Sequence, residues 1–250
     1  MDFSKLNFAV DGDSITQGDQ WSAWVHKLLG FATHTNVAVG SSVWYKRTEC
    51  VNGTYVTTQD FDDPDFAGIS GGWEPTDDVN EMQMRMNNCA VVHIQRFIAG
   101  VKKGEFPVPD VFAFAMGTND APEKAGCAER ALEGKSLDGV DLFCEAGAIR
   151  WCIQTIAENF PECRIFLLTP IQAADPGMNR KNRVVCENIE RIARGLSVQV
   201  IDTFGGCGIT EKFETEGGEG RYLRDGLHPK ENGQEREGRF AAAMIKSKMY

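Results

Sequence analysis

The stretch "FAVDGDSITQGDQW", residues 8–21, changes abruptly from an apolar run to a polar turn. A buried parallel strand that stops at Gly12, Asp13 and Ser14 would end where α/β proteins bind ligands, since these sites lie beyond the carboxyl ends of the strands. Gly-Asp-Ser is also ordinary turn chemistry and a good helix N-cap. This stretch alone therefore leaves a reactive Ser14 and a simple turn as alternatives.

Length and charge favour one acidic domain. At 250 residues the chain can bury a large core, and we expect a single domain spanning residues 1–250. The 26 Lys and Arg against 36 Asp and Glu give a net charge of −10, which argues against nucleic acid or an anionic membrane as a partner. The sequence shows neither a membrane-spanning run nor a signal peptide, so we expect a cytoplasmic protein. It does not indicate an oligomeric state.

The cysteines and histidines do not indicate a metal site. The eight cysteines lack the close pairs of zinc or redox motifs, and we expect mostly reduced, partly buried thiols. His26, His34 and His93 lack ligand spacing, which favours packing or surface roles over metal binding. "GDSITQG" lacks the ending of a phosphate loop, and no dinucleotide-binding glycine motif follows a strand. We therefore expect neither a metal nor an organic cofactor.

Apolar runs typical of buried parallel strands alternate with helical patterns along the chain. The predicted strands are 6–10, 36–39, 111–116, 165–169 and 198–201. The predicted helices are 20–30, 87–104, 143–161, 179–196 and 238–249. Five strands alternating with helices predict a parallel sheet covered on both faces, a three-layer α/β/α sandwich.

Two insertions, at about 45–86 and 121–139, interrupt this pattern. Both follow predicted strands at their carboxyl ends, where they could wall a binding site, although surface decoration is the alternative. Trp44, Tyr45 and Trp73 lie at or within the first insertion. If exposed, these aromatic rings could stack on a sugar or acyl group, but aromatic residues more often pack in a core.

Polar residues that suit acyl transfer recur at two further places. "FAFAMGTNDAP" puts Asn119 and Asp120 beyond the third predicted strand, at the same sheet edge as Ser14. "YLRDGLHPKENG" places Asp225 three residues before His228. Acyl transfer by serine needs a nucleophile, a base, a carboxylate that orients the base, and donors for the oxyanion. All four types of group are present.

Together these three motifs resemble, in order and spacing, the motif blocks of the SGNH hydrolases, also called the GDSL esterase/lipase family. The resemblance extends from Leu6 to Gly233. It implies a flavodoxin-like sheet, for which we expect the strand order 2-1-3-4-5. It also implies that Ser14 is the nucleophile, His228 the general base and acid, and Asp225 the carboxylate that orients His228. The backbone N–H of Ser14 and the side-chain amide of Asn119 would bind the oxyanion.

The family's second block matches less well. An asparagine there is commonly followed five residues later by a glycine whose N–H completes the oxyanion hole. In "NVAVGSSVW" Gly40 stands four residues after the asparagine and Ser41 five residues after it. Close approach of a substrate favours glycine, so we assign Gly40 and keep Ser41 as the alternative.

"GISGG", residues 68–72, is a competing nucleophile motif. It matches the G-x-S-x-G elbow of α/β-hydrolases, with Ser70 as the serine. That elbow needs a buried strand before the serine and a helix after it, and the flanking "DFDDPDFA" and "GWEPTDD" predict neither. We interpret the segment as a flexible glycine-rich loop.

The sequence therefore predicts a serine esterase that acts on a small-molecule or carbohydrate ester. The acidic first insertion offers no continuous apolar surface for a fatty acyl chain, which favours short acyl groups such as acetyl on a polar alcohol. The alternative is a catalytically inactive carbohydrate- or ester-binding module on the same fold.

Overall fold

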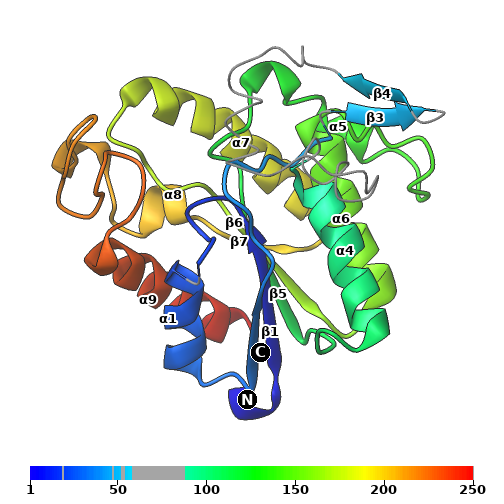
Figure 1. The fold of residues 1–250 in the computed structure, drawn as a ribbon, viewed down its shortest axis with the longest axis horizontal. Helices are drawn as coiled ribbons and strands as arrows, with labels where there is room; N and C mark the ends of the chain where they lie inside the picture. The colour runs from blue at the N-terminus through cyan, green and yellow to red at the C-terminus, as the bar shows by residue number, and fades with distance from the viewer. Residues whose placement is uncertain (19, 47, 52–53, 58–87, 250) are drawn as a thin grey trace.

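The computed structural model describes residues 1–18, 20–46, 48–51, 54–57 and 88–249. Its main sheet has five parallel strands in the order β2-β1-β5-β6-β7 (Figure 1). β3 and β4 belong to a separate sheet, so numbering only the five strands of the main sheet along the chain gives the order 2-1-3-4-5. The predicted parallel sheet is therefore confirmed. The strands are β1 (Asn7–Gly12), β2 (Thr33–Asn36), β5 (Val111–Ala115), β6 (Arg164–Leu168) and β7 (Gln199–Ile201).

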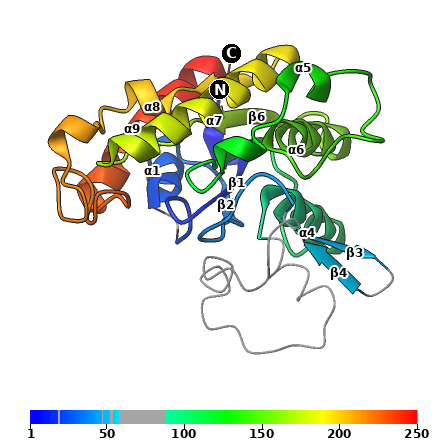
Figure 2. The same ribbon diagram turned by 90° about the horizontal axis from the view of Figure 1, so that it is seen from above.

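Helices cover both faces of this sheet, which confirms the predicted three-layer architecture (Figures 1 and 2). Successive residues of a strand point to opposite faces, so β1 contributes Phe8 and Val10 to one core and Ala9 to the other. The first core lies under α1 (Gln20–Leu29) and α9 (Glu231–Lys248). The second lies under α4 (Ala90–Lys103), α6 (Glu145–Asn159) and α7 (Pro176–Gly195). The short helices are η1 (Phe3–Lys5), η2 (Pro122–Lys124), α5 (Ala128–Ala131), α8 (Thr203–Gly206) and η3 (Glu211–Phe213).

The second strand lies a few residues earlier than its apolar pattern predicts. The pattern predicts a strand at 36–39, but β2 ends at Asn36. The chain nevertheless stays beside β1, because Val37 N–H donates to Val10 O at 2.9 Å and Val39 N–H donates to Gly12 O at 3.1 Å. β2 is an edge strand whose residues are all half-buried, so it does not need the apolar run that marks a central strand.

Helix α9 begins at Glu231, earlier than the predicted 238–249, and so includes Gly238, which packs against α1. A Cβ at Gly238 would lie 2.4 Å from Trp24 Cβ and 2.7 Å from Trp21 O on α1. Glycine is unfavourable inside an isolated helix, but here it allows α1 and α9 to approach closely. Tertiary contact therefore overrides local helix propensity in this stretch.

The two insertions contain structure of their own. In the first, β3 (Thr48–Val51) and β4 (Thr54–Thr57) pair antiparallel, and residues 58–87 lie outside the described part of the chain. The second, 121–139, holds η2 and α5 and is tied to α6 by Arg150. The buried Arg150 guanidinium donates to the carbonyl oxygens of Ala131, Glu133, Gly134 and Ser136, at 2.5 to 3.1 Å.

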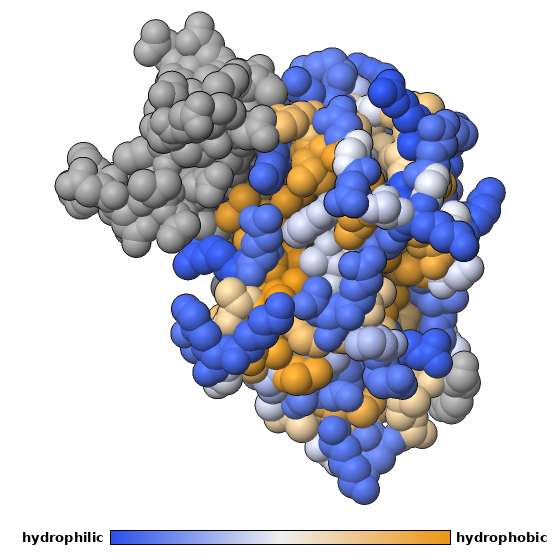
Figure 3. All heavy atoms as spheres, turned by 90° about the vertical axis from the view of Figure 1, so that its right-hand side faces the viewer, coloured by the Kyte–Doolittle hydropathy of each residue, from blue (hydrophilic) through white to orange (hydrophobic). Residues whose placement is uncertain are grey.

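The face that α4 and α6 cover carries both hydrophilic and apolar residues (Figure 3). A pocket of about 250 Å³ beside α4 is lined by Val37, Val39, His93, Arg96, Phe97, Glu105 and Phe106.

None of the helices within the described residues has the length and apolar composition needed to span a bilayer.

Two buried carboxyl groups line a small cavity between the end of β1 and α9. Asp13 is 1% exposed and Glu237 is 3% exposed. Ile15 N–H donates to Asp13 Oδ1 at 3.0 Å, whereas Asp13 Oδ2 and Glu237 Oε2 have no hydrogen-bond partner among the described residues. The cavity, which Thr118 and Thr169 also line, has a volume of about 10 Å³, close to the minimum for one water molecule.

Burial raises the pKa of both carboxyl groups. It raises the pKa of Glu237 to about 8, and the nearby charge of Asp13 adds to this rise. Burial also raises the pKa of Asp13 to about 6, although hydrogen bonding from Ile15 and Thr118 and the charge of His228 lower it. Between the ordinary carboxyl pKa values and these values, the folded protein binds more protons than the unfolded chain. The contribution of these two groups to the free energy of unfolding therefore falls as the pH rises from about 4 to about 8.

We expect Glu237→Gln to flatten this pH dependence, because a neutral amide has no proton to lose and can donate to Asp13. Between about pH 5 and pH 9, the wild-type melting temperature should fall by roughly 5–10 °C more than that of the variant. Thermal unfolding followed by circular dichroism measures both. Glu235→Gln, which alters a surface ion pair with Arg239 on the same helix, should behave as wild type. A Glu237→Gln variant as pH-sensitive as the wild type would contradict this account.

Candidate active site

The turn after β1 places Ser14 at the carboxyl edge of the sheet. Thr16 N–H and Gln17 N–H donate to Asp13 O at 3.0 and 2.9 Å, so the chain turns as soon as the strand ends. Gly12 is needed at this point because a Cβ there would lie 2.4 Å from Thr16 Oγ1 and 2.5 Å from Ala115 O. The half-buried Ser14 therefore stands at the start of a tight, closely packed turn.

A chain of short contacts joins Ser14 to His228 and Asp225. Ser14 Oγ lies 3.0 Å from His228 Nε2, and His228 Nδ1 lies 2.8 Å from Asp225 Oδ2. The His228 side chain is 24% exposed and that of Asp225 46%, so the pair is open to solvent on one side. In this geometry the imidazole can accept the serine proton while the carboxylate holds the other ring nitrogen.

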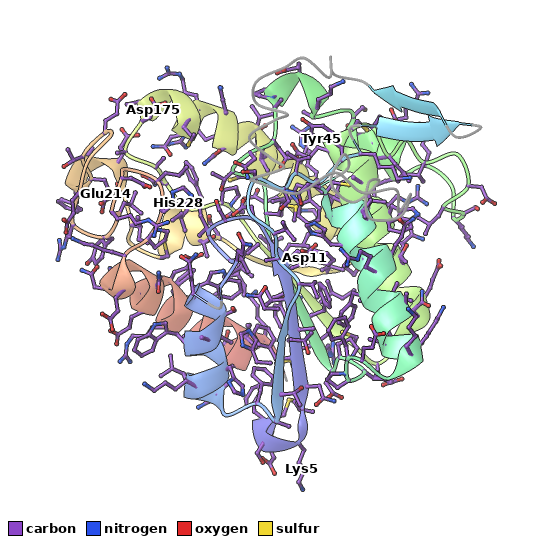
Figure 4. All side chains as sticks on the ribbon, in the orientation of Figure 1. Lys5, Asp11, Tyr45, Asp175, Glu214 and His228 are labelled. Carbon is purple, nitrogen blue, oxygen red and sulfur yellow. The ribbon has the colours of Figure 1, made fainter. Side chains whose placement is uncertain are left out.

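The segment that carries Asp225 and His228 is fixed by backbone contacts. Gly226 takes a φ of +84°, a left-handed conformation that favours glycine, and its carbonyl accepts Ala174 N–H at 2.7 Å. The Glu214 carboxylate accepts the N–H groups of Tyr222 and Leu223 at 3.1 and 2.9 Å. Figure 4 shows Glu214 and His228 in the same part of the molecule. The loop geometry therefore does not depend on the Asp225–His228 contact alone.

Asp225 is held in its ionised form. Its partial burial would raise the pKa, but hydrogen bonds from the His228 N–H, the His228 ring and the Leu227 N–H together lower it to about 2. A carboxylate ionised at neutral pH accepts the Nδ1 proton of His228. This leaves Nε2 as the acceptor that faces Ser14.

Gly40 lies beside Ser14, and its N–H already has a partner. A Cβ at Gly40 would lie 3.6 Å from Ser14 Cβ and only 2.8 Å from Gln17 Oε1. Gly40 N–H donates to this Gln17 oxygen at 2.9 Å. The next residue, Ser41, has a φ of +61°, which is uncommon for a residue with a side chain.

Asn119 lies beyond β5, next to the segment that carries Gly40. Its Nδ2 donates to Ser42 O at 3.0 Å, and Ser42 Oγ donates to Gly12 O at 3.0 Å. Gly117, just before it, has a φ of +131°, and a Cβ there would lie 2.5 Å from Val185 Cγ1. The turn after β5 thus needs glycine to bring Asn119 back towards the segment after β2.

The remaining candidates of the sequence have structural roles where they are described. Trp44 and Tyr45 are 0% and 2% exposed, so they pack in the core and cannot stack on a ligand. His26 Nε2 donates to Phe31 O at 2.9 Å, and its ring stacks on that of His34. Ser70 and Trp73 lie outside the described residues.

Thiols and metal-binding side chains form no cluster in the described part of the chain. No group of three or more His, Cys, Asp or Glu side chains there could hold a metal ion. The expected free thiols are confirmed for the cysteines that the structure describes, and burial raises the pKa of several of them. The free cysteines are Cys89, Cys127, Cys144, Cys152, Cys163, Cys186 and Cys207.

Sequence reasoning did not single out Gln17, Gln20 or Asn88, which shape this edge of the sheet. Gln20 Nε2 donates to Ser14 O at 2.8 Å, and Asn88 Nδ2 donates to Gly40 O at 2.7 Å. The two glutamines lie within one or two turns of Ser14, so their proximity was available from the sequence. Asn88 is 48 residues from Gly40, and no local pattern indicates that contact.

Solved structures resemble this fold over nearly its whole length. A possible lipase from Chitinophaga pinensis DSM 2588 aligns with a TM-score of 0.59 at 14% identity, covering 97% of this chain and 98% of that chain. The lipase/acylhydrolase from Enterococcus faecalis gives 0.52 at 14%, with 97% and 96% covered. Est24, a carbohydrate acetylesterase from Sinorhizobium meliloti, gives 0.53 at 13%, with 97% and 99% covered. At such low identities these likenesses show the fold alone.

A family model provides the stronger link. A comparison with curated proteins found no match. The model of the GDSL-like Lipase/Acylhydrolase family, however, matches residues 11–236. This range runs from the end of β1 into α9 and includes all the site residues described above. The chain therefore belongs to the GDSL-like lipase/acylhydrolase family.

Proposed function

We propose that this protein is a serine esterase that hydrolyses carboxylic esters. Ser14 is the nucleophile, His228 the general base and acid, and Asp225 the carboxylate that orients His228. The observation that carries the proposal is the contact chain of 3.0 Å from Ser14 to His228 and 2.8 Å from His228 to Asp225, in a member of an acylhydrolase family.

The reaction begins when His228 Nε2 accepts the Ser14 proton as Ser14 Oγ attacks the ester carbonyl carbon. The imidazolium that forms is stabilised by the ionised Asp225. His228 then gives its proton to the departing alcohol, which leaves an acyl group on Ser14. A water molecule, deprotonated by His228, attacks this acyl group and releases the carboxylic acid.

Three donors are proposed for the oxyanion: the backbone N–H groups of Ser14 and Gly40 and the side-chain amide of Asn119. The place of Gly40 beside Ser14 supports its role, and Ser41 is the alternative backbone donor. In the structure Gln17 Oε1 accepts the hydrogen bond of the Gly40 N–H, in the way that an oxyanion would. In the reaction the Gln17 side chain moves aside, and Asn119 turns from Ser42 O towards the substrate.

The proposed substrates are short acyl esters, such as acetyl esters, of a polar alcohol such as a carbohydrate. Gln17, Gln20 and Asn119 give the described part of the site polar side chains that suit a hydroxylated alcohol. The structural neighbour Est24 carries the name of a carbohydrate acetylesterase, which supports the same class. The existing contacts of Gly40 N–H and Asn119 Nδ2 favour a second candidate, a catalytically inactive carbohydrate- or ester-binding module.

The first test concerns the nucleophile. Ser14→Ala should lower turnover of p-nitrophenyl acetate by on the order of 10⁴-fold or more and abolish labelling by an organophosphonate. Ser70→Ala, which alters the competing glycine-rich motif, should leave both nearly intact. Labelling that disappears with Ser70 would overturn the assignment, and a wild-type protein without turnover would favour the binding module.

The second test concerns the oxyanion. Asn119→Ala should lower kcat by on the order of 10² to 10³-fold, because one oxyanion donor is lost in the transition state. Asn159→Ala is the control, since the Asn159 side chain donates to Thr155 O within the last turns of α6. A kcat equal to that of wild type would place Asn119 outside the site.

The third test concerns substrate size. A short site for a small acyl group should give a higher kcat/KM for p-nitrophenyl acetate than for the octanoyl ester. Esters of two to about ten carbons would be compared in the wild type and in Trp73→Ala. Preference that rises steadily with chain length would contradict the short site, and an unchanged profile in Trp73→Ala would remove Trp73 from it.

A further inference from the structure

A buried hydrogen-bonded chain of three side chains joins β1 to the segment that carries Gly40. Asp11 Oδ1 lies 2.8 Å from His93 Nδ1, and His93 Nε2 lies 3.0 Å from Asn88 Oδ1. Asn88 Nδ2 then donates to Gly40 O at 2.7 Å. Asp11, His93 and Asn88 are 0%, 2% and 3% exposed, and Figure 4 shows Asp11 near the centre of the molecule.

The direction of each hydrogen bond follows from the Gly40 carbonyl. A carbonyl oxygen only accepts, so the Asn88 atom that contacts it is the amide nitrogen. The Asn88 oxygen therefore faces His93 Nε2, which must carry a proton. A second proton lies between His93 Nδ1 and Asp11 Oδ1, which also accepts Gly12 N–H at 2.9 Å. The Asp11–His93 pair thus holds two protons and has no net charge, which suits its burial.

The peptide at the end of this chain needs support. Ser41 follows Gly40 with a φ of +61°, a costly conformation that persists only where the surrounding structure holds it. Asn88 holds the carbonyl on one side of this residue, and Asn119 holds the Ser42 carbonyl on the other. Val43 N–H also donates to Asn88 O at 3.3 Å, so the backbone of Asn88 is tied to the same segment.

We propose that Asn88 and His93 are positioning residues that hold the Gly40–Ser41 peptide, and with it the adjoining Gly40 N–H, beside the oxyanion formed on Ser14. This inference rests on the proposed function. His93 acts through Asn88, and Asp11 fixes the His93 ring from the strand that also carries Ser14 at its end. Strand β1 thus positions Ser14 through the turn that follows it, and it positions the Gly40 segment through the side chains of Asp11, His93 and Asn88. A backbone donor held in this way lowers the barrier because its own peptide needs no rearrangement when the Gln17 side chain moves aside.

The experiment compares two buried asparagines that each donate Nδ2 to a backbone carbonyl. Asn88→Ala removes the donor to Gly40, and Asn188→Ala removes the donor to Ala125 at 2.9 Å. Both variants should melt at lower temperature than the wild type. Asn88→Ala should also lower kcat for p-nitrophenyl acetate by on the order of 10 to 10²-fold with little change in KM, whereas Asn188→Ala should keep the wild-type kcat. A wild-type kcat in Asn88→Ala would overturn the inference.

A second measurement needs no variant to fold. Nitrogen-15 NMR of the histidine-labelled wild-type protein should show His93 protonated at Nε2, with this N–H protected from exchange. An unprotonated Nε2 would overturn the direction of these hydrogen bonds and the inference with it.

Ser14→Ala in the kinetic assay separates the proposed function from the positioning role of Asn88 and His93. Turnover that survives Ser14→Ala overturns both proposals, whereas Ser14-dependent turnover with wild-type kcat in Asn88→Ala overturns only this one.

Discussion

Parallel pairing of β1 with β2 on one side and β5 on the other is the constraint on which the rest of this structure depends. Val10 pairs with Asn36 and Gly12 with Ala115, so all three strands end at one edge. The segments that follow them carry Ser14, Gly40 and Asn119. Backbone hydrogen bonds set this pairing, so the backbone alone brings the segments of Ser14, Gly40 and Asn119 to the same edge of the sheet.

His228 reaches the same edge by a different route. It lies on a turn just before α9, and α9 is held against α1 by the close approach at Gly238. A bridge between Leu223 and Pro229 closes the turn. The 3.0 Å contact between Ser14 and His228 therefore depends on helix packing as much as on the local loop. This packing also explains how two residues 214 positions apart in the chain come into contact.

Buried polar groups concentrate around the end of β1, and the structure neutralises them in two ways. In the Asp11–His93 pair, the imidazole Nδ1 lies 2.8 Å from the carboxylate Oδ1, so each group offsets the charge of the other. Asp13 and Glu237 lack such a partner, and burial raises the pKa of each instead. Removing an uncompensated charge from water costs free energy, and each of the two arrangements reduces this cost. The same edge that holds the proposed nucleophile is thus a place where stability depends on pH.

The sequence by itself determined the alternation of strands and helices, the sheet edge where polar segments gather, and the short Asp225-x-x-His228 motif. These features depend on local periodicity and on glycines at tight turns, such as Gly12, which a sequence displays directly. Tertiary structure alone decided that Trp44 and Tyr45 are buried, that α9 extends back to Glu231, and that Asn88 contacts Gly40 across 48 residues. Such contacts form because elements far apart in the chain pack together, and the periodicity of one element shows which face is buried but not which partner buries it.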